Sequence, residues 1–426
     1  MADTATKVYE IVVLGGNFGG LGATHYLLRH TIPSLQRTNK GSLFHITLVS
    51  PNRQAYFKIG SPRTLVQPNL LPEARLWKPL SEAFAQYPSD QVTVVQAVAT
   101  GLSSHERTVT VTHRGPDASV ASESMIPYDA LLIATGTTAP SPLWTLHEDE
   151  SLTSREFEAV QKALPTAKTI LVAGGGPVGI ETAGELASAY PSAEITLLSG
   201  GSGLLPRVRS KIGARAQSYL QDHFGVNVVH DLRVSSTSAG GPGTGPTEVT
   251  LSDGTTRPVD LYIDATGGVP NSQFLPPGWL DVTGRINTRD AHFRVQGDAG
   301  DGVYVLGDIV AGSNNTLFDL DAMVPTVCSA VAVDLAALLS PGAQPASRPG
   351  LLGIFFGGGG SASGVPAEKE FSPMRDTMLV PMGTGGGVGM VMGWQVPSWF
   401  VRMVKSKSYL IDMFDPVVAG SKWGKA

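Results

Sequence analysis

The chain has 426 residues, a formal net charge of −5 and a single cysteine. This length exceeds what one hydrophobic core serves well, so we expect two or three domains. The charge gives no broad field for nucleic acid, and one cysteine excludes a disulfide framework and a multi-thiolate metal site. With no secretory signal and no apolar run of the ~18 residues that a membrane span needs, we expect a cytoplasmic enzyme.

A glycine-rich turn follows the first apolar run and precedes a helix. Its residues are Gly15, Gly16, Asn17, Phe18, Gly19 and Gly20. Such a strand, turn and helix start place backbone N–H groups and the positive end of a helix dipole against a dinucleotide pyrophosphate. Asn17 stands where a glycine is usual. Because asparagine tolerates a positive φ better than most side chains, we expect a strained but permitted turn.

Alternating and apolar runs after this turn predict further strands. Residues 45–50 form a second strand that ends in Ser50, and residues 92–98 and 108–112 alternate like a small antiparallel meander. Residues 128–136 predict a buried strand that ends in Ala134, Thr135 and Gly136.

A second glycine-rich turn begins 159 residues after the first and precedes a helix that carries Glu181. Its residues are Gly174, Gly176, Pro177, Val178 and Gly179. One such turn is weak evidence, since glycines at this spacing also occur by chance. Two turns, each between an apolar run and a helix, strongly indicate two bound dinucleotides.

The region after the second turn repeats the pattern of the first half. Residues 194–199 form a strand that ends in Ser199, and residues 259–268 end in a strand and turn that include Gly267. Neither Ser50 nor Ser199 is the carboxylate that accepts from a ribose 2′-OH and repels a 2′-phosphate. We therefore expect loose coenzyme choice. Three cations either meet the 2′-phosphate or are solvated helix charges: Arg207, Arg209 and Lys211.

Less regular segments complete the chain. Residues 235–247 predict a mobile hairpin tip and residues 357–364 a similar loop, while residues 320–339 predict a helix. A hairpin is expected after Met378, followed by one helix with apolar positions at Trp399, Phe400, Met403, Val404, Leu410, Ile411 and Phe414. Basic residues among them leave open a membrane-surface helix, but we expect a packed interface without stable membrane anchoring.

Together with Gly302–Asp308, the two turns and the two Ala-Thr-Gly strand ends follow the order seen in flavoproteins with two dinucleotide folds, related to glutathione reductase. Within that superfamily the chain resembles the apoptosis-inducing-factor-like oxidoreductases, especially fungal homologues of the mitochondrion-associated inducer of death. The closer marks are residues 56–63, 379–393 and 405–409.

The resemblance implies an α/β fold with two Rossmann-like domains and a C-terminal interface domain. FAD would lie on the first fold and NAD(P)H on the second, and a homodimer is possible. We expect the FAD-binding domain at residues 1–145 and 286–345. The NAD(P)H-binding domain is expected at 146–285 and the interface domain at 346–426.

The resemblance also assigns roles to single residues. It implies that Asp308, after Gly307, binds the ribityl chain of FAD and that the next helix points its N-terminus at the flavin. Glu181 would lie near the nicotinamide, paired with Arg63 or Lys58, and these three are the candidate catalytic residues. Pro62 would line the wall beside the flavin.

Neither place where the disulfide reductases of this fold keep their cysteine pair has a cysteine, and Cys328 lies alone in an apolar helix. The nine histidines show no metal-ligand spacing. We therefore expect hydride from NAD(P)H to pass through the flavin directly to a small quinone-like or other conjugated acceptor. Two alternatives remain, a natural-product tailoring oxidoreductase and an NAD(P)H redox-sensing interaction protein.

Overall fold

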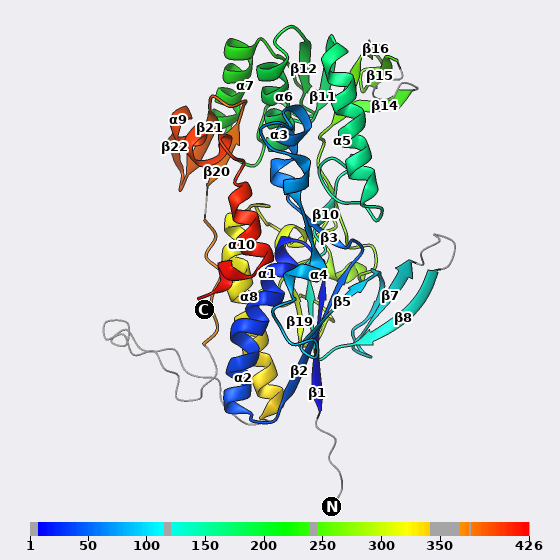
Figure 1. The fold of residues 1–426 in the computed structure, drawn as a ribbon, viewed down its shortest axis with the longest axis vertical. Coiled ribbons are helices and arrows are strands. Elements are labelled where there is room, and N and C mark those ends of the chain that lie inside the picture. Colours follow the sequence, from blue (N-terminus) through cyan, green and yellow to red (C-terminus); the bar gives the residue numbers. More distant parts are fainter. Residues whose placement is uncertain (1–6, 115–120, 239–244, 341–366, 375, 426) are drawn as a thin grey trace, which may run out of the picture.

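The computed structural model describes residues 7–114, 121–238, 245–340, 367–374 and 376–425. Two parallel sheets with helices on their faces lie one above the other along the molecule (Figure 1). The expected α/β architecture with two Rossmann-like units is confirmed. The predicted loop at residues 357–364 lies outside the described residues. The proposed domain boundaries stay a prediction.

The first sheet is entirely parallel, with the order β19-β9-β1-β2-β5. Its strands are β1 (Val8–Leu14), β2 (Leu43–Ser50), β5 (Val92–Gln96), β9 (Ala130–Ile133) and β19 (Val303–Val305). The apolar run of β1 is buried on both faces, as a central parallel strand requires. Helices α1 (Phe18–Tyr26) and α2 (Ile32–Thr38) pack beside α8 (Leu317–Leu339) (Figure 1).

Helix α8 differs in two ways from the expectation. It begins at Leu317, three residues earlier than predicted, because the Thr316 side chain accepts a hydrogen bond from the Asp319 N–H and caps the helix. It is also long and apolar enough to cross a bilayer, so the expectation of no such run was wrong. More than half of its most apolar window is buried inside the protein, as in the core helix of a globular domain.

The second sheet repeats the plan with the order β13-β12-β11-β17. Its strands are β11 (Thr169–Ala173), β12 (Glu194–Leu198), β13 (Asn227–Val229) and β17 (Leu261–Asp264). The helices of this unit are α5 (Ser151–Ala163), α6 (Pro177–Ala189) and α7 (Ser210–Phe224).

Two antiparallel sheets extend these units. They contain β6 (Val98–Ser103), β7 (Thr108–Arg114) and β8 (Ala121–Pro127), and β14 (Val234–Ser238), β15 (Thr247–Leu251) and β16 (Thr256–Val259). The predicted meander was wrong in one strand, because β5 pairs with β2 in the parallel sheet and β6 takes its place. The predicted tip at 235–247 is shorter, since its ends belong to β14 and β15 and residues 239–244 lie outside the described residues.

Short elements connect the two units. They are β3 (Gln54–Tyr56), β4 (Trp77–Pro79), α3 (Ser61–Val66), α4 (Leu80–Ala83), β10 (Thr137–Thr138) and β18 (Val269–Pro270). Strands β10 and β18 pair antiparallel, so the segments that leave the two Ala-Thr-Gly ends run side by side. Asn271 strengthens this double connection by hydrogen bonds to both backbone and side chain of Thr135.

The C-terminal region is a three-stranded sheet followed by short helices. These elements are β20 (Met378–Pro381), β21 (Gly387–Val391), β22 (Trp394–Val396), α9 (Ser398–Val401) and α10 (Phe414–Val418). The prediction of one apolar helix was wrong, because Tyr409 and Leu410 have positive φ and break it. Trp399 is 65% exposed, whereas α10 returns to the first unit and packs on α1 (Figure 1).

Candidate dinucleotide and redox site

The first glycine turn joins β1 to α1. Gly15 has φ +117°, and a Cβ there would lie 2.3 Å from the Ala134 carbonyl oxygen, so only glycine fits. The expectation of strain at Asn17 was wrong, since its φ is −114° and its backbone is extended. Its Nδ2 donates to the Tyr56 carbonyl at 3.0 Å. The Asn17 Oδ1 is buried and has no hydrogen-bond partner within the described part of the chain.

The second glycine turn joins β11 to α6 with the same geometry. Gly174 has φ +132°, and a Cβ on Gly179 would lie 1.9 Å from the Gly174 carbonyl oxygen. That contact brings the start of α6 against the turn, as the fingerprint requires. A Cβ on Gly176, in contrast, would meet nothing within 4 Å. The protein therefore leaves open space at the position where a pyrophosphate would approach.

The serines that end the second strands support these turns. A Cβ on Gly16 would lie 2.5 Å from Ser50 Oγ, and one on Gly175 would lie 2.6 Å from Ser199 Oγ. The Ser199 hydroxyl donates to the Gly203 carbonyl at 2.9 Å and is buried. The two halves thus share one packing arrangement, in which a small side chain lets the turn lie against the neighbouring strand.

The remaining predicted cofactor residues surround the turns. Phe18 packs against Phe57 and Phe414 with ring centroids 5.7 Å from each, and Pro62 is buried in α3. Gly136 and Gly267 have φ +64° and +102° and open space at their Cβ positions. The others lie on the first turns of α1 and α6 or at the end of β9: Gly19, Gly20, Pro177, Val178 and Ala134.

Asp308 lies in the short 3₁₀ turn that follows β19 and pairs with Lys58, whose Nζ is 2.6 Å from Asp308 Oδ2. Burial alone would raise the pKa of Asp308. Lys58, Arg285 and Arg207 outweigh it and hold the pKa below the usual range. The expectation that Lys58 is available to Glu181 was therefore wrong. Instead, it stabilises the carboxylate assigned to the ribityl chain.

Glu181 lies in the first turns of α6 and is 3% exposed. Its partner is Lys405 of the C-terminal region, with Nζ 2.6 Å from Glu181 Oε1 and 3.2 Å from the Leu379 carbonyl. Burial raises the pKa of Glu181, and Lys405 opposes that shift. The predicted pairing with Arg63 or Lys58 was wrong, because the cation comes from a segment 224 residues away in the sequence.

Arg63 instead forms a buried bidentate pair with Glu185, one helical turn beyond Glu181. Its Nε and Nη2 lie 2.6 and 2.8 Å from the two carboxylate oxygens, and Nη2 also donates to the Ser406 carbonyl. The Tyr409 hydroxyl donates to Glu185 at 2.9 Å. Burial lowers the pKa of Arg63, but Glu185 more than compensates and raises it.

Sequence reasoning missed Glu185, Lys405 and Tyr409. The spacing of Glu185 four residues after Glu181 was a usable signal, because both then lie on one face of α6. Lys405 and Tyr409 gave no local signal, since only the tertiary fold brings the C-terminal region to α6.

Cys328 is buried inside α8, where its Sγ contacts the Ala23 carbonyl and burial raises its thiol pKa. No group of three or more metal-ligating side chains gathers among the residues that the structure describes.

These features fit a dinucleotide at each turn. The open Cβ position of Gly176 gives room for the pyrophosphate at the second turn. At the first turn, the Asn17 Oδ1 is a hydrogen-bond acceptor that has no partner among the described residues. Helices α1 and α6 direct their N-terminal N–H groups toward the turns.

The family model described as pyridine nucleotide-disulphide oxidoreductase matches residues 9–329. Oxidoreductase phnG of Penicillium herquei is 31% identical over 100% of this chain and 99% of its own length. Oxidoreductase ptaL of Pestalotiopsis fici is 32% identical over 82% and 89%. Human ferroptosis suppressor protein 1 is 23% identical over 95% and 94%.

Solved structures agree on the fold. The sulfide:quinone oxidoreductase of Aquifex aeolicus aligns over 98% of this chain and 93% of its own, with a TM-score of 0.66 and 13% identity. A persulfide reductase of A. fulgidus aligns over 79% and 60%, with a TM-score of 0.56 and 20% identity.

Proposed function

Because the chain belongs to the pyridine nucleotide-disulphide oxidoreductase family, as an apoptosis-inducing-factor-like, FAD-dependent NAD(P)H oxidoreductase, we propose that its electrons go directly to a small quinone-like or other conjugated acceptor. The balanced reaction is NAD(P)H + H⁺ + quinone → NAD(P)⁺ + hydroquinone. Bound FAD would supply the two-electron redox chemistry between the two substrates. The chain's own residues bind both nucleotides and place a buried ion pair at the start of α6.

One observation carries the proposal of direct transfer. A relay through a disulfide needs two thiols that approach within bonding distance, and the chain has one cysteine. That thiol is buried inside α8, and burial keeps it protonated by raising its pKa. We therefore infer that electrons from NAD(P)H pass to a diffusible acceptor.

Two other proposals share this chemistry. One is a tailoring oxidoreductase for a dedicated natural product, which fits a chain whose 31–32% identical relatives are fungal oxidoreductases. The other is a redox sensor, in which reduced protein changes its contacts with partners. The same proposal includes a cytoplasmic location and a possible homodimer. It includes neither stable membrane anchoring nor nucleic-acid binding.

Steady-state NADPH oxidation with and without 1,4-benzoquinone tests the proposed function. A quinone reductase shows turnover that the quinone accelerates many-fold over dioxygen. Rapid bleaching of bound FAD by NADPH followed by slow recovery with every quinone would favour the sensor. Acceleration confined to one elaborate conjugated substrate would favour the tailoring enzyme.

We predict that Lys405→Met makes the bleaching of FAD by NADPH more sensitive to acid. Without the ammonium, burial raises the pKa of Glu181 further, so Glu181 takes up a proton and loses its charge at a higher pH. The rate should fall as pH falls, with its midpoint at a higher pH than that of the wild type. Stopped-flow absorbance over a range of pH measures it.

The controls for this prediction lie beside Lys405. Lys405→Arg keeps the charge and should restore the wild-type profile, and Lys407→Met removes an exposed cation from the same segment. An unchanged midpoint in Lys405→Met would show that the pair does not control the charge of Glu181.

Arg233 is the cation that we assign to the coenzyme 2′-phosphate. A Cβ on Gly200, just beyond β12, would lie 3.0 Å from Arg233 Nε, so the guanidinium lies over the turn where the ribose is expected. Of the three cations expected there, Arg209 is paired with Asp376 and Arg207 interacts with Asp308 and Arg285. The third, Lys211, is exposed at the start of α7.

We predict that Arg233→Ala lowers the kcat/KM for NADPH relative to NADH by about tenfold or more. The lost bond joins two charged groups and is worth about 1.5–3 kcal/mol. Arg209→Ala is the matched control and should change the ratio little, because its charge is already paired. A wild type that prefers NADH by a hundredfold would refute the assignment.

A further inference from the structure

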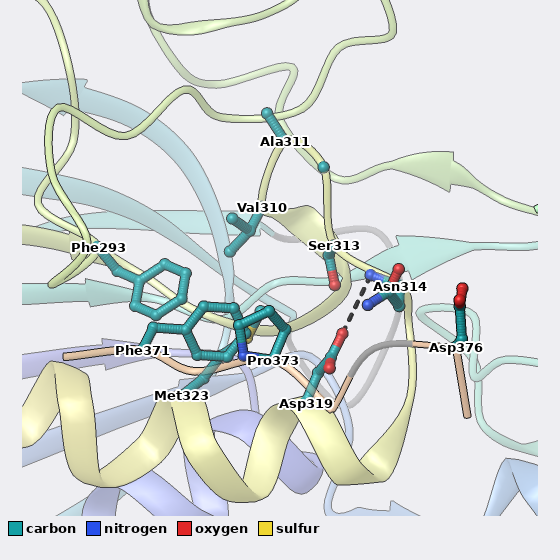
Figure 2. Close-up of a pocket in the computed structure, with 11 residues that line it drawn as sticks. Phe293, Val310, Ala311, Ser313, Asn314, Asp319, Met323, Phe371, Pro373 and Asp376 are labelled. Carbon is teal, nitrogen blue, oxygen red and sulfur yellow. Dashed lines mark hydrogen bonds between the residues drawn. The ribbon is translucent and has the colours of Figure 1, made fainter. Parts of the chain in front are cut away.

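A cavity of about 510 Å³ lies beside the loop that leads from Asp308 to α8 (Figure 2). Residues 310–314 form one wall, α8 forms the floor and the segment around Phe371 closes the opposite side. The Gly307 N–H contacts Met323 Sδ at 3.4 Å, so the cavity shares its floor with the turn that carries Asp308. Asp319, in the first turn of α8, lines the cavity, and the resemblance directs this end of the helix at the flavin.

One part of the cavity wall is aromatic and apolar. Phe293 and Phe371 meet edge to face, with ring centroids 4.8 Å apart and planes at 67°, and Figure 2 shows Met323 and Pro373 beside them. Phe293 has φ +65°, a strained conformation for a bulky residue. Strain of this kind is typical of binding sites, where the surrounding structure fixes one side chain in place.

The polar side chains of the cavity are Ser313, Asn314, Asp319 and Asp376. Asp319 is 1% exposed, and its Oδ2 accepts from the Asn314 N–H at 3.3 Å (Figure 2). Its Oδ1 has no hydrogen-bond partner among the described residues. A buried acceptor left unpaired is costly, so this oxygen favours a ligand that carries a donor. Lysine, arginine and histidine are absent from the described lining, which disfavours an anionic ligand.

We propose that this cavity binds the electron acceptor, and that the acceptor is a planar, uncharged quinone with a phenolic hydroxyl on its ring. The ligand rings pack against the paired Phe293 and Phe371 side chains, and the hydroxyl donates to Asp319. The volume suits a molecule of two or three fused rings. The proposal rests on the proposed function, whose reaction converts NAD(P)H, one proton and the quinone into NAD(P)⁺ and the hydroquinone.

Equilibrium binding to the FAD-loaded protein, without NAD(P)H, tests the site independently of turnover. The probes are 6-hydroxy-1,4-naphthoquinone and 1,4-naphthoquinone, followed by quenching of tryptophan fluorescence. We expect the hydroxylated probe to bind about tenfold more tightly to the wild type, because its hydroxyl donates to a carboxylate. Asp319→Asn should remove that preference. Ala311→Phe fills the cavity and should abolish binding of both probes.

Val282→Phe adds the same side chain at a fully exposed position and is the matched control. Unchanged probe binding by Ala311→Phe would overturn the proposal. Loss of FAD from Ala311→Phe would also overturn it, because the cavity would then belong to the cofactor. If Asp319→Asn does not fold, the Ala311→Phe result decides alone. Tight binding that Ala311→Phe abolishes, in a protein that reduces no quinone, would support the site and refute the proposed function.

Discussion

Replacing Glu185 with alanine is expected to lower the free energy of unfolding by about 3–5 kcal/mol. Glu185 is fully buried and accepts hydrogen bonds from Arg63, Gln67 and Tyr409. Its loss leaves the Arg63 guanidinium, also buried, without a counter-charge or water. Urea denaturation of the FAD-loaded protein measures the change.

Two controls separate the buried charge from simple loss of packing. The double variant Arg63→Met with Glu185→Leu removes both charges and should recover most of the stability. Asp301→Ala breaks an exposed pair with Arg289 and should cost no more than about 1 kcal/mol. A loss below that value in Glu185→Ala would show that Arg63 finds water or another partner.

Alanine substitutions at Gly179 and Gly176 of the second turn are expected to differ in their effect on stability. At Gly179 the new Cβ would lie 1.9 Å from the Gly174 carbonyl oxygen, so α6 must move and both stability and NAD(P)H binding should fall. At Gly176 the Cβ enters open space with φ −82°, which alanine adopts freely. Gly176→Ala should therefore keep wild-type stability while the methyl group obstructs the coenzyme.

We expect the KM for NAD(P)H to rise about tenfold or more in Gly176→Ala, the loss that one misplaced contact of about 1.4 kcal/mol produces. Thermal unfolding of the coenzyme-free protein and steady-state kinetics on both variants distinguish the two effects. An unchanged KM in Gly176→Ala would place the pyrophosphate away from this turn.

Much of the nucleotide-binding apparatus was predictable because its rules are local. The glycines at positions 15, 20, 174 and 179 lie where a strand turns sharply into a helix, and the matching serines end the next strands. The error at Asn17 arose within the same rule, because the middle position of the turn has an extended backbone in both halves.

The partners of the charged site residues were not predictable in this way. Reasoning along the chain offered Arg63 and Lys58 to Glu181, but both cations are nearer to other carboxylates. Alternating polarity likewise identified β5 as a strand and could not say which sheet it joins. Helical spacing after Trp399 could not reveal that Tyr409 and Leu410 adopt positive φ.

By itself the sequence determined the two dinucleotide folds, their order and the absence of a second thiol. The glycine turns depend on steric contacts between residues that are close in the chain, and the number of cysteines is read directly from the sequence. The tertiary structure decided which charges meet. Lys405 reaches Glu181, and Tyr409 reaches Glu185, because the C-terminal region packs on α6. Because an unpaired charge is costly when it is buried, the folded structure keeps these groups paired. The members of each pair are too far apart in the sequence for a local pattern to reveal them.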